Sequence, residues 1–189
     1  MAGKEAPPPY YPPAHQGAQP QHNVIYVQQP TIVAAPKPKT NNAFATNNVV
    51  QLISRSSGGT LQVVQSSSGH LVVDGCGPDA QAFNNVWTVI NEGNNMVRLH
   101  NNNNYLAIVN GTTTVVFMSP GSHHGIETKL RLSTVGQFVL MESCKESGRY
   151  VGILNNGSLK SALATGRENH SHFGVRLVSS PYPQQGAKK

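Results

Sequence analysis

The stretch RYVGILNNGSLKSALATGRENHSHFGVRLV, residues 149–178, decides the fold because its pattern occurs three times in the chain. Its first run, RYVGIL at 149–154, aligns with NYLAIV at 104–109 after a shift of 45 residues (149 to 104). A second shift of the same length reaches GTLQVV at 59–64. Self-similarity at a fixed period is the signature of a repeat architecture. The sequence therefore predicts three copies of one structural unit.

Each copy contains four short runs that are rich in β-branched and aromatic residues and are separated by Gly, Asn and Ser. Such runs are typical of β-strands, and Asn-Gly pairs, found at 110–111 and 156–157, favour tight hairpins. No stretch keeps the 3.6-residue apolar period of an amphipathic helix. The twelve predicted strands are residues 49–54, 60–65, 70–74 and 86–90, then 96–100, 105–109, 115–118 and 128–132, then 137–142, 149–154, 158–163 and 172–178.

Twelve strands in three fourfold units fit few architectures. A solenoid stacks more copies, and a propeller needs about four blades or more. A β-trefoil fits, with six strands closed into a short barrel and six paired as hairpins that cap one end. Closure also removes the exposed strand edges that invite aggregation. The expected core residues, at equivalent positions of the three copies, are Leu52, Leu99 and Leu140 or Met141; Leu61, Leu106 and Val151; and Trp87, Leu130 and Phe173 or Val175.

The composition divides the chain into a domain and two tails. Residues 1–46 hold nine of the 13 prolines, and proline fixes φ and removes a hydrogen-bond donor. We expect this tail to be disordered with polyproline-II character, residues 47–178 to form the β-trefoil, and residues 179–189 to be a short disordered tail. Within the first tail, Pro7-Pro8-Pro9-Tyr10 fits the PPxY pattern that WW domains bind. The alternative is a solvated tail with no ligand role.

The net charge of +6 does not indicate a nucleic-acid-binding protein. The predicted domain carries nine Lys and Arg against seven Asp and Glu, so the two tails supply most of the excess. Proteins that bind nucleic acids concentrate positive charge on one face or stripe, and the sequence shows no such cluster. Nucleic acid is therefore not an expected partner.

The sequence contains no motif that predicts enzymatic chemistry. A hydrolase elbow, a phosphate-binding loop, a paired-cysteine motif and HExxH are all missing, so we expect neither enzymatic activity nor a cofactor. His123-His124 and the pair His170 and His172 lack a third ligand, so no metal site is expected. Two cysteines, Cys76 and Cys144, do not indicate a disulfide framework. We expect free thiols, and the alternative is a bond between the two.

The N-terminal residues predict an internal location by default. MAGKEAPPPYYPP at 1–13 has no apolar core of a secretory signal, and no apolar run approaches the roughly 20 residues that span a bilayer. The default expectation is therefore a cytoplasmic protein that does not insert into a membrane.

Two stretches give the chain a family resemblance. Residues 149–178 contain an aromatic-apolar strand, an Asn-Gly turn, a short strand, a Thr-Gly-basic loop and a terminal strand with Phe. This order resembles the last repeat of a fibroblast growth factor, and NYLAIVNG at 104–111 resembles the corresponding strand and turn. The predicted domain thus resembles the fibroblast growth factor and interleukin-1 superfamily of β-trefoils. The hisactophilins and fascins, which bind actin, share the same skeleton.

The resemblance also implies a binding site. In the growth factors, an Asn and several Lys or Arg of the last repeat bind heparan sulfate. The family loop is densely basic, whereas the loop of this chain places Glu168 beside its cations. The positions that match, or that we expect nearby, are Asn155, Asn156, Lys160, Arg167, Lys145 and Arg149.

Three functions follow as alternatives. The first is a non-enzymatic ligand of the growth-factor and interleukin-1 type, which binds a protein receptor and a sulfated glycan; some members leave cells without a signal peptide. The second is an intracellular adaptor whose trefoil binds a protein or cytoskeletal partner and whose Pro-rich arm recruits WW-type domains. The third, a lectin with three equivalent pockets, is disfavoured because the lectin trefoils repeat a Gln-x-Trp signature and this chain has one Trp.

Overall fold

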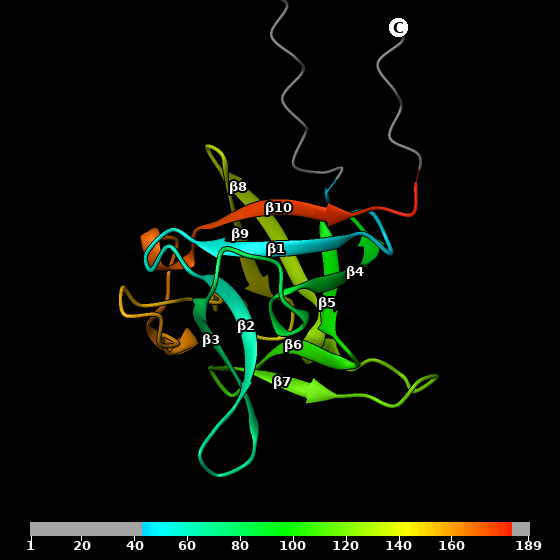
Figure 1. Cartoon of the computed structure of the whole chain (residues 1–189), viewed down its shortest axis with the longest axis horizontal. Helices are drawn as coiled ribbons and strands as arrows, with labels where there is room; N and C mark the ends of the chain where they lie inside the picture. Colours follow the sequence, from blue (N-terminus) through cyan, green and yellow to red (C-terminus); the bar gives the residue numbers. More distant parts are fainter. Residues whose placement is uncertain (1–42, 183–189) are drawn as a thin grey trace, which may run out of the picture. The chain divides into compact units, whose positions relative to one another are not determined.

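The computed structural model describes residues 43–182, all of them within the compact unit Pro36–Lys189. The described chain is all-β, with ten strands joined by antiparallel pairing into one sheet (Figure 1). The strands are β1 (Val49–Ser54), β2 (Thr60–Gln65), β3 (Leu71–Gly77), β4 (Trp87–Gly93), β5 (Met96–Asn101), β6 (Asn104–Val109), β7 (Thr112–Phe117), β8 (Leu130–Val135), β9 (Phe138–Ser143) and β10 (Phe173–Ser179). Four single 3₁₀ turns accompany them, η1 (Phe83–Asn85), η2 (Ile126–Thr128), η3 (Ala162–Ala164) and η4 (Asn169–Ser171). None of the helices in this part of the chain is long and apolar enough to cross a membrane.

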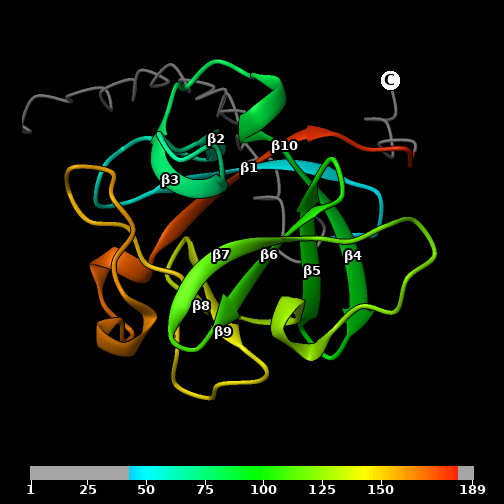
Figure 2. The same cartoon turned by 90° about the horizontal axis from the view of Figure 1, so that it is seen from below.

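Six of the strands pair in a closed ring. β1 pairs with β4, β4 with β5, β5 with β8, β8 with β9, β9 with β10, and β10 pairs back with β1. The first and last strands therefore lie side by side (Figure 1). The other four strands form two hairpins, β2–β3 attached to β1 and β6–β7 attached to β5 (Figure 2). None of the six strands of the ring is left with an open edge.

The three expected copies have the same burial pattern on their first strands. In β1, β5 and β9 the second, third, fourth and sixth residues are buried and the other two are half-buried. Leu61, Leu106 and Val151 are fully buried in one core, together with Trp87, Leu130 and Phe173. Of the expected pairs, Met141 belongs to this core cluster, Leu140 is buried outside it, and Val175 packs against it only partly buried.

The packed domain begins earlier than residue 47. The side chain of Phe44 is 2% exposed and belongs to the core, and its carbonyl accepts a hydrogen bond from the Asn91 carboxamide at 2.8 Å. The four residues 43–46 are thus part of the packed structure and not of the tail predicted from the sequence. The motif Pro7-Pro8-Pro9-Tyr10 lies outside the described residues.

Asparagine pairs build the tight turns. Asn94-Asn95 joins β4 to β5 with φ of 50° and 59°, and Asn102-Asn103 joins β5 to β6 with φ of 47° and 65°. The predicted hairpin at Asn110-Gly111 joins β6 to β7, with φ of 50° and 70°. Two successive positive φ values define the type I′ turn, whose twist matches that of the flanking strands. Asparagine adopts this conformation more readily than other side chains, which accounts for the Asn-rich sequence here.

The third copy differs from its prediction. Residues 149–154 and 158–163 were expected as strands, but they form only isolated bridges, Glu142 with Tyr150 and Ile153 with Leu159. Their backbone amides donate to other segments, since the Ile153 N–H bonds to the His170 carbonyl at 2.8 Å and the Ala162 N–H bonds to the Gly111 carbonyl at 2.9 Å. Residues 149–163 therefore form backbone hydrogen bonds with other segments instead of pairing with each other as a regular hairpin.

Candidate functional site

The six residues expected to bind a glycan lie on three segments of the third copy. Lys145 and Arg149 follow β9, Asn155 and Asn156 form a turn, and the remaining two cations lie in the long connection to β10. This turn is fixed against β3, because the Gly75 N–H donates to the Gly157 carbonyl at 2.7 Å. The carboxamide oxygen of Asn156 accepts the Ser158 N–H at 3.0 Å, and both Asn155 and Asn156 are exposed.

The positive charge of Lys160 is compensated within the loop. Its ammonium forms an ion pair with Glu168, and His170 Nδ1 lies 3.5 Å from the same nitrogen. The hydrogen bond from Lys160 outweighs burial and holds the pKa of the Glu168 carboxyl below its usual value. A cation already paired in this way has less charge to offer an external anion.

The other predicted cations remain without a carboxylate partner in the described part of the chain. Arg149 donates to the Leu163 carbonyl at 2.8 Å, and no ion pair involves Lys145 or Arg167 within residues 43–182. Lys145 and Arg167 are exposed, and Arg149 is half-buried. These three residues, and not Lys160, keep their charge available.

Sequence reasoning missed a cluster formed by Arg55, Phe138 and His172. The guanidinium carbon of Arg55 lies 4.8 Å from the centroid of the Phe138 ring, and the His172 ring stacks on Phe138 at 5.8 Å and 13°. Arg55 Nη1 lies 3.0 Å from His172 Nδ1. The three side chains therefore contact one another pairwise, with a cation–π contact and a hydrogen bond.

The strand order explains how residues so distant in sequence meet. Arg55 directly follows β1, whose last residue Ser54 pairs with Phe173 of β10, and Phe173 pairs with Val139 of β9. The Arg55 N–H also donates to the His172 carbonyl at 2.9 Å. The cluster thus spans three adjacent strands from the first and third copies. No local sequence motif could reveal this cluster, because its residues become neighbours only when β1, β10 and β9 pair in the closed ring.

The surroundings of His172 favour its neutral imidazole. Burial, then the positive charges of Arg55 and Arg167, lower the pKa of its imidazole below the ordinary value. A guanidinium can only donate, so His172 Nδ1 is the acceptor and the proton of the neutral ring is on Nε2. That nitrogen is buried and has no hydrogen-bond partner among the described residues.

A second histidine cluster lies beside β5 and β6. His100 stacks on Tyr105 at 4.9 Å, and the Tyr105 hydroxyl lies 3.0 Å from His124 Nε2. Burial, together with the charge of His124, lowers the pKa of His100. No three side chains of His, Cys, Asp or Glu gather to hold a metal ion within residues 43–182, and Cys76 and Cys144 are free thiols.

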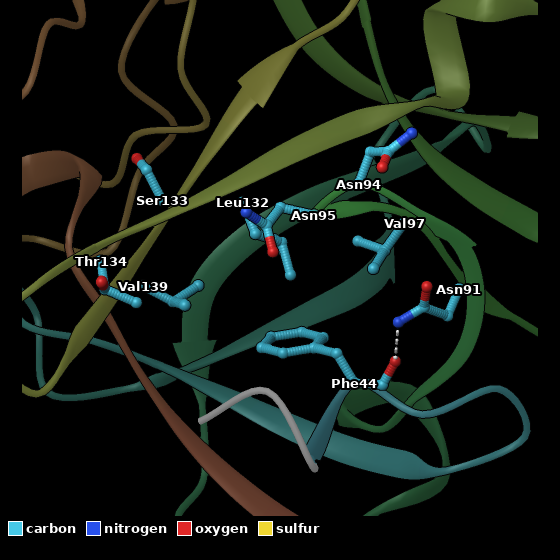
Figure 3. A pocket seen from close by; sticks show the side chains of 9 residues that line it. All are labelled: Phe44, Asn91, Asn94, Asn95, Val97, Leu132, Ser133, Thr134 and Val139. Atoms are coloured by element: carbon cyan, nitrogen blue, oxygen red, sulfur yellow. Dashed lines mark hydrogen bonds between the residues drawn. The ribbon is translucent and has the colours of Figure 1, made fainter. Parts of the chain in front are cut away.

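One cavity of about 380 Å³ opens between the turn joining β4 to β5 and the hairpin of β8 and β9 (Figure 3). The ring of Phe44 points into it, toward Val97 and Val139, and the hydrogen bond from Asn91 to the Phe44 carbonyl closes one side. The lining side chains are all uncharged: Phe44, Asn91, Asn94, Asn95, Val97, Leu132, Ser133, Thr134 and Val139. Nothing in this lining favours an anion.

No protein-family model matches this sequence, and no curated protein matches it either.

Proposed function

We propose that the chain is a β-trefoil of the fibroblast growth factor and interleukin-1 type. In this proposal the six-stranded ring is the barrel, and the hairpins β2–β3 and β6–β7 with the irregular segment 149–163 are the three caps. The support is the closed pairing of the ring and the repeated burial pattern of β1, β5 and β9. The equivalent burial of Leu61, Leu106 and Val151 agrees with a pseudo-threefold arrangement.

The function that we propose is a non-enzymatic binding module that binds a sulfated glycan and a protein receptor. The observation that carries it is a group of five cations with no ion-pair partner among the described residues, Arg55, Arg131, Lys145, Arg149 and Arg167. All five belong to the third copy or contact it, Arg55 through His172 and Arg131 through the pairing of β8 with β9. A sulfated glycan carries closely spaced permanent anions, so several unpaired cations on one part of a surface suit it.

Heparin-affinity chromatography of the full chain tests this function. We expect salt-dependent retention, because salt screens contacts between exposed charges. Arg167→Gln should elute at lower salt than the wild type. Arg176→Gln is the control of equal charge change, because Arg176 is already paired with Asp79 at 2.6 Å and should shift elution less. Elution of the wild type with the void volume, or equal shifts for the two variants, would refute the proposal.

A second candidate, an intracellular adaptor, is favoured by two exposed aromatic side chains. Phe83 is 74% exposed and Phe117 is 66% exposed. They border the same turn, since the Asn101 carboxamide donates to the Phe83 carbonyl at 2.6 Å and Asn104 pairs with Phe117. Exposed aromatic residues are enriched in protein interfaces. Capture of WW domains by the full chain, abolished by Tyr10→Ala, would favour this adaptor.

A further inference from the structure

We propose that the cavity beside the turn joining β4 to β5 binds a neutral pyranose, the six-membered ring of an uncharged sugar. Its lining comes from Phe44 and from β4, β5, β8 and β9, four strands of the closed ring, together with the turn itself. The mouth of a β-barrel is a common place for a small-molecule site. This inference does not rest on the sulfated-glycan function proposed above, because no cation lines the cavity.

The bottom of the cavity is apolar. Phe44, Val97 and Val139 line it, and all three are buried in the core cluster. The Phe44 ring points between the other two side chains and closes the cavity from below (Figure 3). Leu132 is half-buried and extends this apolar surface toward the opening. The C–H groups on one face of a ligand would therefore pack against hydrocarbon here.

The opening of the cavity is polar. The side chains of Asn94, Asn95, Ser133 and Thr134 line it and form no hydrogen bond with another residue between 43 and 182. Asn91 differs, because its carboxamide already donates to the Phe44 carbonyl and accepts the Gly93 N–H at 2.8 Å. Carboxamides and hydroxyls both donate and accept hydrogen bonds. These four side chains therefore suit the hydroxyl groups of a ligand, which also do both.

Backbone contacts hold the two sides of the opening together. Asn95 has a φ of 59°, and its carbonyl accepts the Leu132 N–H at 2.7 Å, which joins the turn to β8. On the other strand of the β8–β9 hairpin, Val139 pairs with Thr134. The polar groups of the opening are thus placed by the fold before a ligand binds, which reduces the entropy lost on binding.

The lining distinguishes between classes of ligand. A charged ligand would lose hydration without gaining an opposite charge. A purely apolar ligand would cover the amides and hydroxyls of the opening and leave them without partners. A neutral pyranose has hydroxyls around its edge and C–H groups on its faces, so it matches both parts of the lining. The volume of about 380 Å³ lies within the usual range of small-molecule sites.

This site differs from the three equivalent pockets of a lectin trefoil. Phe44 precedes β1 and so lies outside the repeated unit. The threefold repeat therefore does not supply this part of the lining in the other copies. A single sugar site is expected here, which needs no repeated Gln-x-Trp signature.

Nuclear magnetic resonance titration of the ¹⁵N-labelled full chain with small sugars tests the site. The probes are N-acetylglucosamine and the methyl glycosides of glucose, galactose and mannose. We expect at least one of them to shift the amides of Asn95 and Thr134 saturably at millimolar concentrations. Glucuronate, a similar ring with a carboxylate, and cyclohexanol, a ring with one hydroxyl, should each bind about fivefold more weakly or worse.

Variants with a matched control locate the binding. Asn95→Gly removes the carboxamide but keeps the positive φ, and it should weaken binding about three- to tenfold. Thr134→Val replaces the hydroxyl with a methyl group and should also weaken binding. The control is Asn103→Gly, at the same position of the turn joining β5 to β6 with a φ of 65°, which should bind as the wild type does. Circular dichroism and the urea midpoint establish that each variant is folded.

Four results would overturn this inference. They are no shift of these amides with any of the four sugars, equal affinities of Asn95→Gly and the wild type, glucuronate binding as tightly as the best neutral sugar, and cyclohexanol binding more tightly than that sugar. Heparin retention measures the cations outside the cavity, so its presence or absence does not change the outcome here.

Discussion

The Gln51 carboxamide donates a hydrogen bond to Asn85 Oδ1 at 3.1 Å, and both side chains are buried. In the next copy the same two positions are Arg98 and Thr128, and the Arg98 guanidinium donates to the Thr128 hydroxyl. A side chain from the middle of a first strand thus bonds to the last residue of the following 3₁₀ turn in both copies. The repeated unit conserves this polar link between strand and turn although both residue types change.

We predict that Asn85→Ala destabilises the domain by about 2–3 kcal/mol, because it leaves several buried polar groups without partners. Asn85 accepts hydrogen bonds from Gln51 and from the Ala82 N–H, and it donates to the carbonyls of Pro78 and Ala80. Urea denaturation followed by circular dichroism measures the change. Gln81→Ala, at an exposed neighbour, is the control and should change stability by less than about 0.5 kcal/mol. Equal midpoints for the two variants would contradict the prediction.

We predict a second loss of stability at the centre of the core. The Trp87 indole N–H donates to the Leu61 carbonyl at 3.0 Å, and the side chain is fully buried. Trp87→Phe removes this donor and leaves a cavity, which should cost about 2–4 kcal/mol. Because Trp87 is the only tryptophan, unfolding is followed by circular dichroism rather than fluorescence. The control is Phe83→Leu at an exposed position, and an unchanged midpoint for Trp87→Phe would show that the bond and the packing contribute little.

Acid should weaken the fold through Glu92. Burial raises the pKa of this carboxyl, but hydrogen bonds from Lys129 and Arg98 and their charges outweigh it, so the pKa lies below its ordinary value of 4.5. A depressed carboxyl pKa gives stability that is fully present above 4.5 and is lost as the pH falls through the folded-state value. We therefore expect the urea midpoint to decrease as the pH is lowered below 4.5. It should fall less in Glu92→Gln, whose stability at neutral pH is already lower because Arg98 loses its partner.

Two histidines should add a separate pH effect at milder acidity. Burial is the main cause that lowers the pKa of His100 and of His172 below 6.5. The unfolded chain therefore binds protons first, so stability should decrease as the pH falls below 6.5 toward the folded-state values. His100→Gln/His172→Gln should reduce this slope, whereas His70→Gln, at an exposed position, should leave it unchanged. A wild-type midpoint that does not change between pH 7.5 and about 5.5 would contradict this prediction.

The short apolar runs predicted most of the strands, because each strand buries its apolar side chains on the face that packs against the core. The equivalent positions Leu61, Leu106 and Val151 were found by aligning the copies, and all three are fully buried. The pattern could not predict that the segment from Arg149 to Leu163 would be irregular. There Gly152 lies so close to Thr165 that an added Cβ would stand 2.6 Å from its methyl group, and this tertiary contact leaves no local signal.

The candidate site was less predictable than the fold. The position of Lys160 in the last repeat predicts a glycan contact, yet its charge is compensated by Glu168. Sequence alone does not show which charged neighbours form ion pairs. Arg55 and His172 are 117 residues apart, so their contact depends on the closure of the ring. Residues that act through such long-range contacts become candidates only when the arrangement of the strands is known.

The most direct test of the account is a nuclear magnetic resonance titration of the ¹⁵N-labelled chain with a heparin hexasaccharide. We predict that the largest shifts of backbone amides and arginine Nε–H groups occur at Arg55, Lys145, Arg149 and Arg167, with little change at the β2–β3 hairpin around Gln65 and Leu71. Shifts centred on that hairpin, or no shifts at all, would contradict the proposal that the unpaired cations of the third copy, together with Arg55, bind a sulfated glycan.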